Sequence, residues 1–271
     1  MFYTILVQPL ANGLILFYKI FGNNLGLAII LFTVALRVIL NPLTKPYMES
    51  MKKMKDLGPE LNKLKQRHGS DKIKFAKAQS DFYKEKGINP GAGCLPYLLQ
   101  IVVLIAFFNV FTRTISGGGN LTENFNKVLY QPLKLESSEV INTKFFYLEM
   151  TKPDTFKLPG IAFAIPGPLI LLSAIAQFLS AKAQSPVLKK EKKLAEKTKT
   201  ESDDFQVAMQ SSMIYTFPLF TLWIGMKFPS ALALYWLVFS LLQLYQQVKG
   251  QGWGGLEPLI DKLKVIKSEK F

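Results

Sequence analysis

Chemically reactive side chains are scarce in this sequence of 271 residues. Its single cysteine, Cys94, rules out a disulfide within the chain, and its single histidine is His68. A histidine-based catalytic triad and a metal site with several histidines are therefore nearly excluded. Neither GxxxxGK[ST] nor GxGxxG occurs, so nothing supports nucleotide binding. We expect a protein that is not an enzyme and that needs no metal or cofactor.

Charge is missing from long stretches, although the whole chain is basic. Lys and Arg number 33 against 19 Asp and Glu, a net charge of +14. A bilayer crossing takes about 20 consecutive, mostly apolar residues. Candidate crossings, each with at most one charged residue, are 25–44, 94–113, 161–181, 211–227 and 230–248. We therefore predict an all-α polytopic membrane protein with a core of five transmembrane helices.

The first 24 residues allow two interpretations. Residues 2–21 are apolar, but they also hold Gln8, Pro9, Asn12 and Lys19. We favour an amphipathic helix over 1–24 that starts near Pro9 and lies at the membrane interface. A sixth span is the alternative. A signal peptide fits less well, because a basic start and a cleavage site are both missing.

Lysine and arginine set the orientation of the predicted spans. They number 12 in residues 44–93, seven in 182–210 and five in the tail 249–271, whereas 114–160 balances five lysines with five acids. Because basic loops stay on the cytoplasmic side, we place 45–93, 182–210 and the C-terminus in the cytoplasm and 114–160 outside. The basic segments would then lie against anionic lipid.

Residues 45–93 are predicted to form a cytoplasmic helical hairpin. Apolar residues recur every three or four positions through Met48, Met51, Met54, Leu57, Leu61 and Leu64. Gly58-Pro59 should kink or restart this helix, and 68–71 should hold a C-cap followed by an N-cap. Ile73, Ala76, Ser80 and Tyr83 would form the facing stripe of the second helix. The methionine stripe is either ordinary hairpin core or a soft surface for apolar substrate segments.

Arg37 is the most informative residue, because it is the one charge within 25–44. An arginine near mid-span costs roughly 2.5–3.5 kcal/mol on insertion scales. No acid occurs in the other predicted spans, so an intramembrane ion pair is hard to build. Two interpretations remain. Arg37 has a structural role, in which it snorkels or binds backbone carbonyls, or it lines a water-filled cavity that receives a negatively charged group. Thr33, one turn before it, and Gln100, Gln177, Thr216, Tyr235 and Trp236 could complete such a cavity, or serve as contacts between helices.

Several motifs together resemble one known family. Gly26, Thr33, Arg37 and Asn41-Pro42-Leu43-Thr44 are followed by Met51-Lys52-Lys53-Met54, by Asn89-Pro90 and by Gly93-Cys94-Leu95-Pro96 with Gln100. Phe228-Pro229-Ser230-Ala231 and Leu234-Tyr235-Trp236 come later, with a looser match at Lys152-Pro153-Asp154. This combination resembles the YidC/Oxa1/Alb3 family of membrane protein insertases over roughly 25–113 and 207–248.

The resemblance implies a five-helix core and a hydrophilic groove that opens to the cytoplasm and to lipid. Arg37, Thr33, Gln100, Gln177, Tyr235 and Trp236 would line this groove. The partners would be nascent membrane proteins and the bilayer. The ribosome, the signal recognition particle pathway and the Sec translocon are further candidate partners. The functional unit would be a monomer. The sequence departs from the family at Gln100-Ile101-Val102, where Gln-x-Pro is usual. It resembles a minimal bacterial form, which implies a location in a bacterial inner or plasma membrane.

Two other classes of function compete with an insertase or chaperone. An anion-selective channel or small-solute transporter would use Arg37 as its selector. Two observations speak against this alternative: there is only one candidate charge, and the sequence has no clear inverted repeat. A purely structural scaffold would leave Arg37 unexplained.

Overall fold

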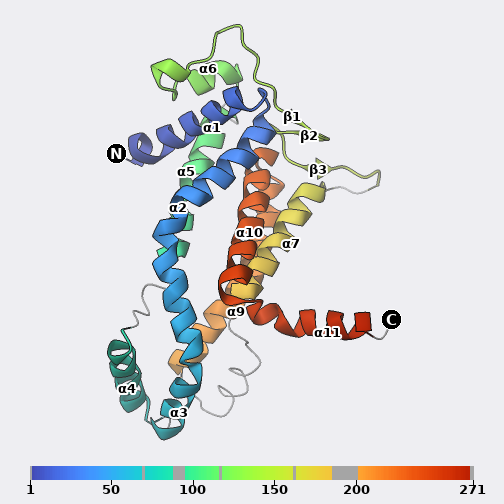
Figure 1. The fold of residues 1–271 in the computed structure, drawn as a ribbon. Helices are drawn as coiled ribbons and strands as arrows, with labels where there is room; N and C mark the ends of the chain where they lie inside the picture. The colour runs from blue at the N-terminus through green and yellow to red at the C-terminus, as the bar shows by residue number, and fades with distance from the viewer. Residues whose placement is uncertain are drawn as a thin grey trace. The chain divides into compact units, whose positions relative to one another are not determined.

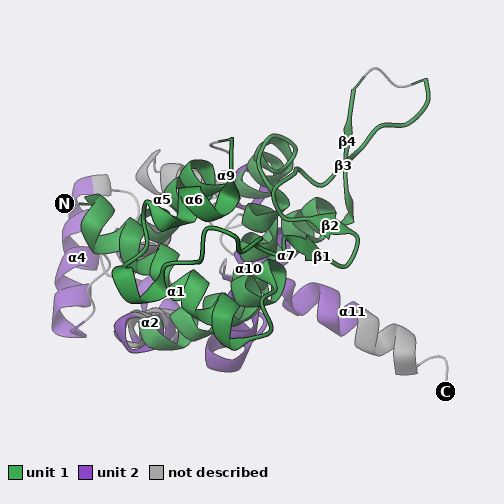
Figure 2. Ribbon diagram, turned by 90° about the horizontal axis from the view of Figure 1, so that it is seen from above, with its two compact units in different colours: residues 1–40, 98–177, 217–242 green, residues 41–97, 178–216, 243–271 purple. Residues whose placement is uncertain are grey.

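We describe the protein from a computed structural model, in which residues 2–68, 71–87, 95–115, 118–160, 163–184 and 201–268 are described. These residues are mostly helical (Figure 1). The chain divides into two compact units, coloured separately in Figure 2. Unit 1 comprises 1–40, 98–177 and 217–242, and unit 2 comprises 41–97, 178–216 and 243–271.

The elements follow one another along the chain as helices, interrupted by one region of short strands. The long helices are α2 (Leu25–Asp56), α5 (Leu95–Thr114), α7 (Pro168–Gln184), α9 (Glu201–Gly225) and α10 (Ser230–Gln251). Unit 1 also holds η1 (Tyr3–Val7), α1 (Gln8–Ile20), α6 (Leu121–Asn126) and η3 (Gln131–Leu133). Its strands are β1 (Lys144–Phe145), β2 (Leu148–Glu149), β3 (Thr155–Phe156) and β4 (Ile165–Pro166). Unit 2 adds α3 (Gly58–His68), α4 (Lys72–Glu85), η4 (Gly254–Leu256) and α11 (Glu257–Ser268).

The core of unit 1 is built where α1, α2, α5 and α10 meet. Phe17, Phe32 and Phe107 connect α1, α2 and α5, with ring centroids 5.6 and 6.0 Å apart. Glycine permits the closest of these approaches, because a Cβ atom at Gly13 would collide with the ring of Phe32. Small residues that let helices approach closely are typical of helix packing in membranes.

The N-terminal helix is held to the α6–η3 region by the buried side chain of Asn12. Its Nδ2 donates to the carbonyl oxygens of Gln8 (2.8 Å) and Val128 (3.2 Å), and its Oδ1 accepts from the Tyr130 N–H (2.7 Å). The helix begins one residue before Pro9, which occupies a first-turn position where its missing N–H costs nothing. Location at the membrane interface stays a prediction for this helix.

The predicted hairpin in 45–93 does not begin with a helix of its own. Helix α2 runs without interruption through Pro42 and Pro46 to Asp56, so the first predicted span continues into the first arm of the hairpin. The expected break at Gly58-Pro59 is confirmed, because α3 starts at Gly58. Helices α3 and α4 pack together, with an ion pair of 3.2 Å between Glu60 and Lys86.

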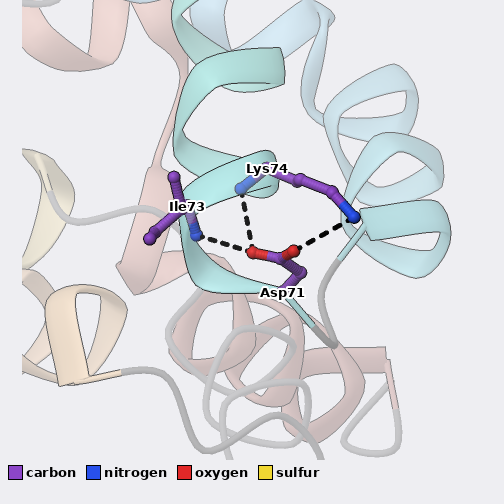
Figure 3. Close-up of polar contacts among 3 residues, drawn as sticks. All are labelled: Asp71, Ile73 and Lys74. Carbon is purple, nitrogen blue, oxygen red and sulfur yellow. Dashed lines mark hydrogen bonds and ion pairs between the residues drawn. The ribbon is translucent and has the colours of Figure 1, made fainter.

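Asp71 is the predicted N-cap of the second arm (Figure 3). Its Oδ1 accepts from the N–H groups of Ile73 and Lys74, each at 3.1 Å. The predicted facing stripe is wrong, because Ile73 is 83% exposed and Phe75 is the buried residue of this helix. Residues two positions apart point to different faces of a helix, so the inward position of Phe75 leaves Ile73 exposed. The side chains of the methionine stripe lie outside the described residues.

The remaining predicted boundaries differ from the structure at three places. Within the span expected at 161–181, residues 163–167 are not helical, because Ile165 and Pro166 pair with Phe156 and Thr155 in the β3–β4 hairpin, and α7 starts at Pro168. Residues 201–210, expected in the loop 182–210, belong to α9. The tail 249–271 contains α11. Helices α5 and α10 start within one residue of the expected positions.

One loop segment, 149–154, holds the starts of both α7 and α10. The buried Asp154 carboxylate accepts from the N–H groups of Leu169 (2.8 Å) and Ile170 (3.3 Å) at the start of α7. The N–H groups of Ser230 and Ala231 donate to the carbonyl oxygens of 152 and 150. The unpaired N–H groups at a helix start thereby find partners within the chain rather than in water.

Candidate functional site

Arg37 lies on α2 and is half-buried against α10. Its guanidinium carbon is 4.8 Å from the centroid of the Phe239 ring. The guanidinium also interacts electrostatically with Tyr235, one turn earlier on α10. The charge therefore faces another helix of unit 1 rather than standing alone on an apolar surface.

A stack of rings extends from this charge into the core of unit 1. Phe107 of α5 stacks on Tyr235 with centroids 4.3 Å apart and planes inclined by 24°, and Tyr235 is 6.0 Å from Phe239. We call these three residues the aromatic column. A guanidinium over an aromatic face gains a cation–π attraction and is more weakly hydrated than an ammonium. The column thus offsets part of the cost of placing Arg37 within an apolar helix.

Thr33 is the second predicted site residue on α2. It is buried, and its hydroxyl donates to the carbonyl oxygen of Ile29 at 2.6 Å. Its hydrogen is therefore already used, whereas the oxygen can still accept a hydrogen bond. The structure places Thr33 one turn from Arg37, as the helical spacing predicts.

The other predicted site residues are placed differently. Gln177 of α7 accepts a hydrogen bond from the hydroxyl of Thr221, so it joins α7 to α9. Trp236 is buried next to Tyr235 in the chain. The side chain of Gln100 lies outside the described residues. The structure therefore brings Arg37 and Tyr235 together, with Thr33 close by on α2, and gives Gln177 a partner in a contact between helices.

Sequence reasoning missed two members of the aromatic column. Phe239 follows Tyr235 by four residues, so helical spacing alone places both on one face of α10. The position of Phe107 could not be found in this way, because it depends on how α5 packs against α10.

This arrangement can attract an anionic group but offers little for covalent chemistry. Among the described residues, no three histidine, cysteine, aspartate or glutamate side chains gather in a way that could hold a metal ion. The guanidinium of Arg37 keeps its positive charge and can only donate hydrogen bonds, because it carries no acceptor atom. Arg37 is half-buried beside the Phe239 ring, so its field is screened less than it would be in water.

The fold defines the class of protein. Over the described residues, Leu25–Leu43 and Ser230–Gln251 are long and apolar enough to cross a membrane, with mean hydropathy values of 2.0 and 1.3. Ile101–Thr114 and Ile214–Gly225 are shorter apolar helical stretches. Together with the half-buried charge of Arg37 between α2 and α10, these features are typical of an α-helical integral membrane protein.

Comparison with known proteins identifies the family. The profile of the family described as 60Kd inner membrane protein matches residues 16–251. A "Membrane protein insertase YidC" of Shewanella sp. (strain MR-7) is 33% identical over 238 residues, and one of Shewanella frigidimarina (strain NCIMB 400) is 34% identical over the same length. Each alignment covers 87% of this chain and 35% of the relative. The chain belongs to the 60Kd inner membrane protein family, and it spans about a third of the length of the curated relatives that it matches.

Family membership confirms the resemblance on which the insertase prediction was based. It also confirms a membrane protein of mostly helical structure. The five-span count, the orientation and the residue roles stay predictions.

Proposed function

We propose that this chain inserts membrane proteins into the bilayer and helps them fold, with no chemical step. The observation that carries the proposal is the half-buried Arg37, whose guanidinium faces Phe239 and Tyr235 of α10 in a chain of this family. The cationic group is positioned by packed aromatic side chains, so it is ready for an anionic group before that group arrives.

The proposed topology has five spans, with α1 at the interface and the α3–α4 arm and C-terminus in the cytoplasm of a bacterial cell. The support is the distribution of lysine and arginine, of which 12 lie in residues 44–93. An interfacial position of α1 is supported by its exposed apolar side chains Leu16 and Ile20, and by the exposed Ile5 of the preceding η1.

In the proposed mechanism, Arg37 receives the short polar tail of a substrate within a hydrophilic groove. An acidic residue at about 4 Å from the guanidinium would gain about 4 kcal/mol at an effective dielectric constant near 20. This gain partly offsets the cost of removing the tail from water. Tyr235 can add a hydrogen bond, and Thr33 can accept one, along the same path.

The apolar segment of the substrate supplies the main driving force. It would move along the lipid side of the helices and enter the bilayer, gaining roughly 25 cal/mol for each Å² of apolar surface removed from water. One guanidinium compensates little charge, so we expect short tails with few charges to be transferred, rather than folded or highly charged domains. Nascent single-span proteins are thus the proposed substrates, delivered directly or through ribosome, signal recognition particle or Sec partners.

The experiment that tests the proposal is insertion of a single-span substrate into liposomes containing the purified full chain. Wild type, Arg37→Lys and Arg37→Ala would be compared on tails with and without acidic residues. We expect Arg37→Lys to retain activity and Arg37→Ala to lose it mainly for acidic tails. A loss of about 10-fold corresponds to 1.4 kcal/mol, well within the Coulomb gain above.

Arg113→Ala is the matched control, because it removes an exposed arginine of α5 that contacts Tyr3 of η1 at 5.2 Å. It should leave acidic-tail insertion unchanged. If Arg37→Ala inserts every tail as well as wild type, the electrostatic role of Arg37 is refuted. If wild type conducts anions and inserts nothing, the channel alternative replaces the insertase.

A further inference from the structure

Two short hairpins between α5 and α7 expose large apolar side chains. Phe146 is 89% exposed at the β1–β2 turn, and Phe163 is 70% exposed in the β3–β4 connection. Tyr147, Phe156 and Leu158 are exposed as well. We call these five residues the hairpin surface. Large apolar side chains exposed on two successive hairpins are candidate contact sites for proteins or membranes, because water contact with them is unfavourable.

The hairpins are attached close to the start of α7. Only Gly167 separates β4 from α7, and Asp154, which caps α7, directly precedes β3. The Gly167 N–H donates to the Asp154 carbonyl at 2.8 Å, which closes the base of the hairpin. In the proposed topology α7 crosses the membrane, so the base of the hairpin would lie near the level at which α7 enters the bilayer.

The β3–β4 hairpin projects sideways within unit 1. It extends across the direction of α7 in Figure 1, and it leaves the helices laterally in the end-on view of Figure 2. A hairpin that extended along the helix direction would stand in water. One that extends across it at the end of a membrane-crossing α7 would lie along the membrane surface.

The charges beside the hairpin surface match a lipid headgroup layer. Lys144, Lys152 and Lys157 are exposed next to the hairpin residues, and the one nearby strand acid, Glu149, is half-buried and bonded to the Thr151 hydroxyl at 3.1 Å. Aromatic rings at the headgroup level, with lysines reaching the phosphates, are the usual composition of a membrane interface contact.

The backbone at the β1–β2 turn favours the same interpretation. Phe146 has φ of +53°, a conformation that bulky residues rarely adopt and that glycine or asparagine accepts readily. Phe145, its neighbour, turns inward and packs over Gly26, where a Cβ atom would collide with the ring. Of two adjacent phenylalanines, one therefore anchors the hairpin to α2 and the other is presented outward.

We propose that the hairpin surface inserts into the headgroup–acyl boundary of the leaflet next to the start of α7, as a lateral lipid anchor. This goes beyond the insertase proposal. It depends on α7 being a membrane-crossing helix, not on any substrate. The anchor would fix the tilt of α7 and α10, whose starts are both held by residues 149–154.

Site-specific fluorescence in liposomes tests the proposal. In a full-length Cys94→Ser background, Phe146→Cys, Leu158→Cys and Phe163→Cys would each carry an environment-sensitive dye. The liposomes would contain phosphatidylethanolamine and phosphatidylglycerol. Val140→Cys is the matched control, since this apolar residue of the same loop is 86% exposed but lies outside the hairpins.

We expect the hairpin dyes to emit at shorter wavelength than the control. Quenching by nitroxides on lipid acyl chains should be several-fold stronger, and quenching by aqueous iodide correspondingly weaker. Iodide quenching equal to that of Val140→Cys would overturn the proposal. Protection from both quenchers that grows with the protein-to-lipid ratio would also overturn it and indicate a second copy instead. The insertion activity of the unlabelled variants, measured in parallel, keeps this result separate from the Arg37 test.

Discussion

The cap that Asp154 places on α7 should be one of the most sensitive single points in the loop between α5 and α7. Its carboxylate is 4% exposed and accepts from Leu169 N–H at 2.8 Å and from Ile170 N–H at 3.3 Å. Asp154→Ala removes both bonds and leaves two helix-start N–H groups without their acceptor. The change also removes a negative charge from the positive end of the α7 dipole.

The size of the effect follows from these contacts. A hydrogen bond to a charged group contributes about 1.5–3 kcal/mol, and loss of a helix cap costs about 0.5–2 kcal/mol. The Tyr147 hydroxyl, 3.1 Å from the Leu169 nitrogen, can satisfy part of the lost demand. Desolvation and the nearby Asp154 charge both raise the pKa of Tyr147, so this hydroxyl stays neutral near pH 7. We therefore expect Asp154→Ala to lower the free energy of unfolding by about 2 kcal/mol, and Asp154→Asn, which keeps an acceptor, by about 1 kcal/mol.

Thermal unfolding in detergent, followed by circular dichroism, measures this difference. A loss of 2 kcal/mol should lower Tm by about 4–8 °C for a chain of this size. Glu136→Ala, which removes an exposed acid from the same loop, should stay within about 0.5 kcal/mol of wild type. If Asp154→Ala has the same Tm as Glu136→Ala, the role assigned to the cap is refuted.

A double-mutant cycle sharpens the test. A Cβ atom at Gly167 would collide with the Asp154 carboxylate, so Gly167→Ala should cost about 1–3 kcal/mol in wild type. In the Asp154→Ala background the obstacle is gone, and the same substitution should cost much less. Equal costs in both backgrounds would show that the collision does not govern stability.

Three further perturbations are expected to have definite outcomes. Gly26→Ala should lower Tm, because its Cβ atom would collide with the Phe145 ring. Adding Phe145→Leu to the same chain should restore part of the loss. A double-mutant cycle of the two substitutions measures this coupling. Thr221→Val should lower the free energy of unfolding by about 1 kcal/mol, because it removes the hydroxyl that donates to Gln177. Adding Gln177→Leu should recover stability. An unchanged Tm in the single variant would contradict the contact. The backbone N–H of residue 74 and other hydrogen bonds hold the pKa of Asp71 below its unfolded value. The cap therefore stabilises α4 fully at pH values above the unfolded pKa, and this stabilisation is lost as the pH falls through the folded pKa. Hydrogen exchange of the first turn of α4, corrected for intrinsic rates, should show this loss in wild type and not in Asp71→Ser.

Local signals explain the parts of the fold that could be predicted. Uncharged apolar runs placed α5 and α10 within one residue of their starts, since a helix that meets lipid must satisfy its backbone internally. Gly58-Pro59 marked the break before α3, and Asp71 marked the cap of α4, because both act through bonds within one turn. Arg37 stood out for the same kind of reason: one charge in an apolar run is visible without any knowledge of its neighbours.

Errors arose where distant segments decide local structure. The start of α7 depends on pairing of Ile165 with Phe156 and on the Asp154 carboxylate, which is 15 residues before Leu169 in the sequence. The continuation of α2 through Pro42 runs against a local preference, since the residue before a proline disfavours helix.

By itself, then, the sequence determined the membrane class, the family, the charge asymmetry along the chain and the candidate charge at Arg37, because composition and short-range spacing carry that information. Only the tertiary structure decided what surrounds that charge. The 4.8 Å approach of Arg37 to Phe239, the stack of Tyr235 on Phe107 and the bond from Thr221 to Gln177 each join different helices. Such contacts depend on how helices rotate and pack against one another, and no single helical period contains that information.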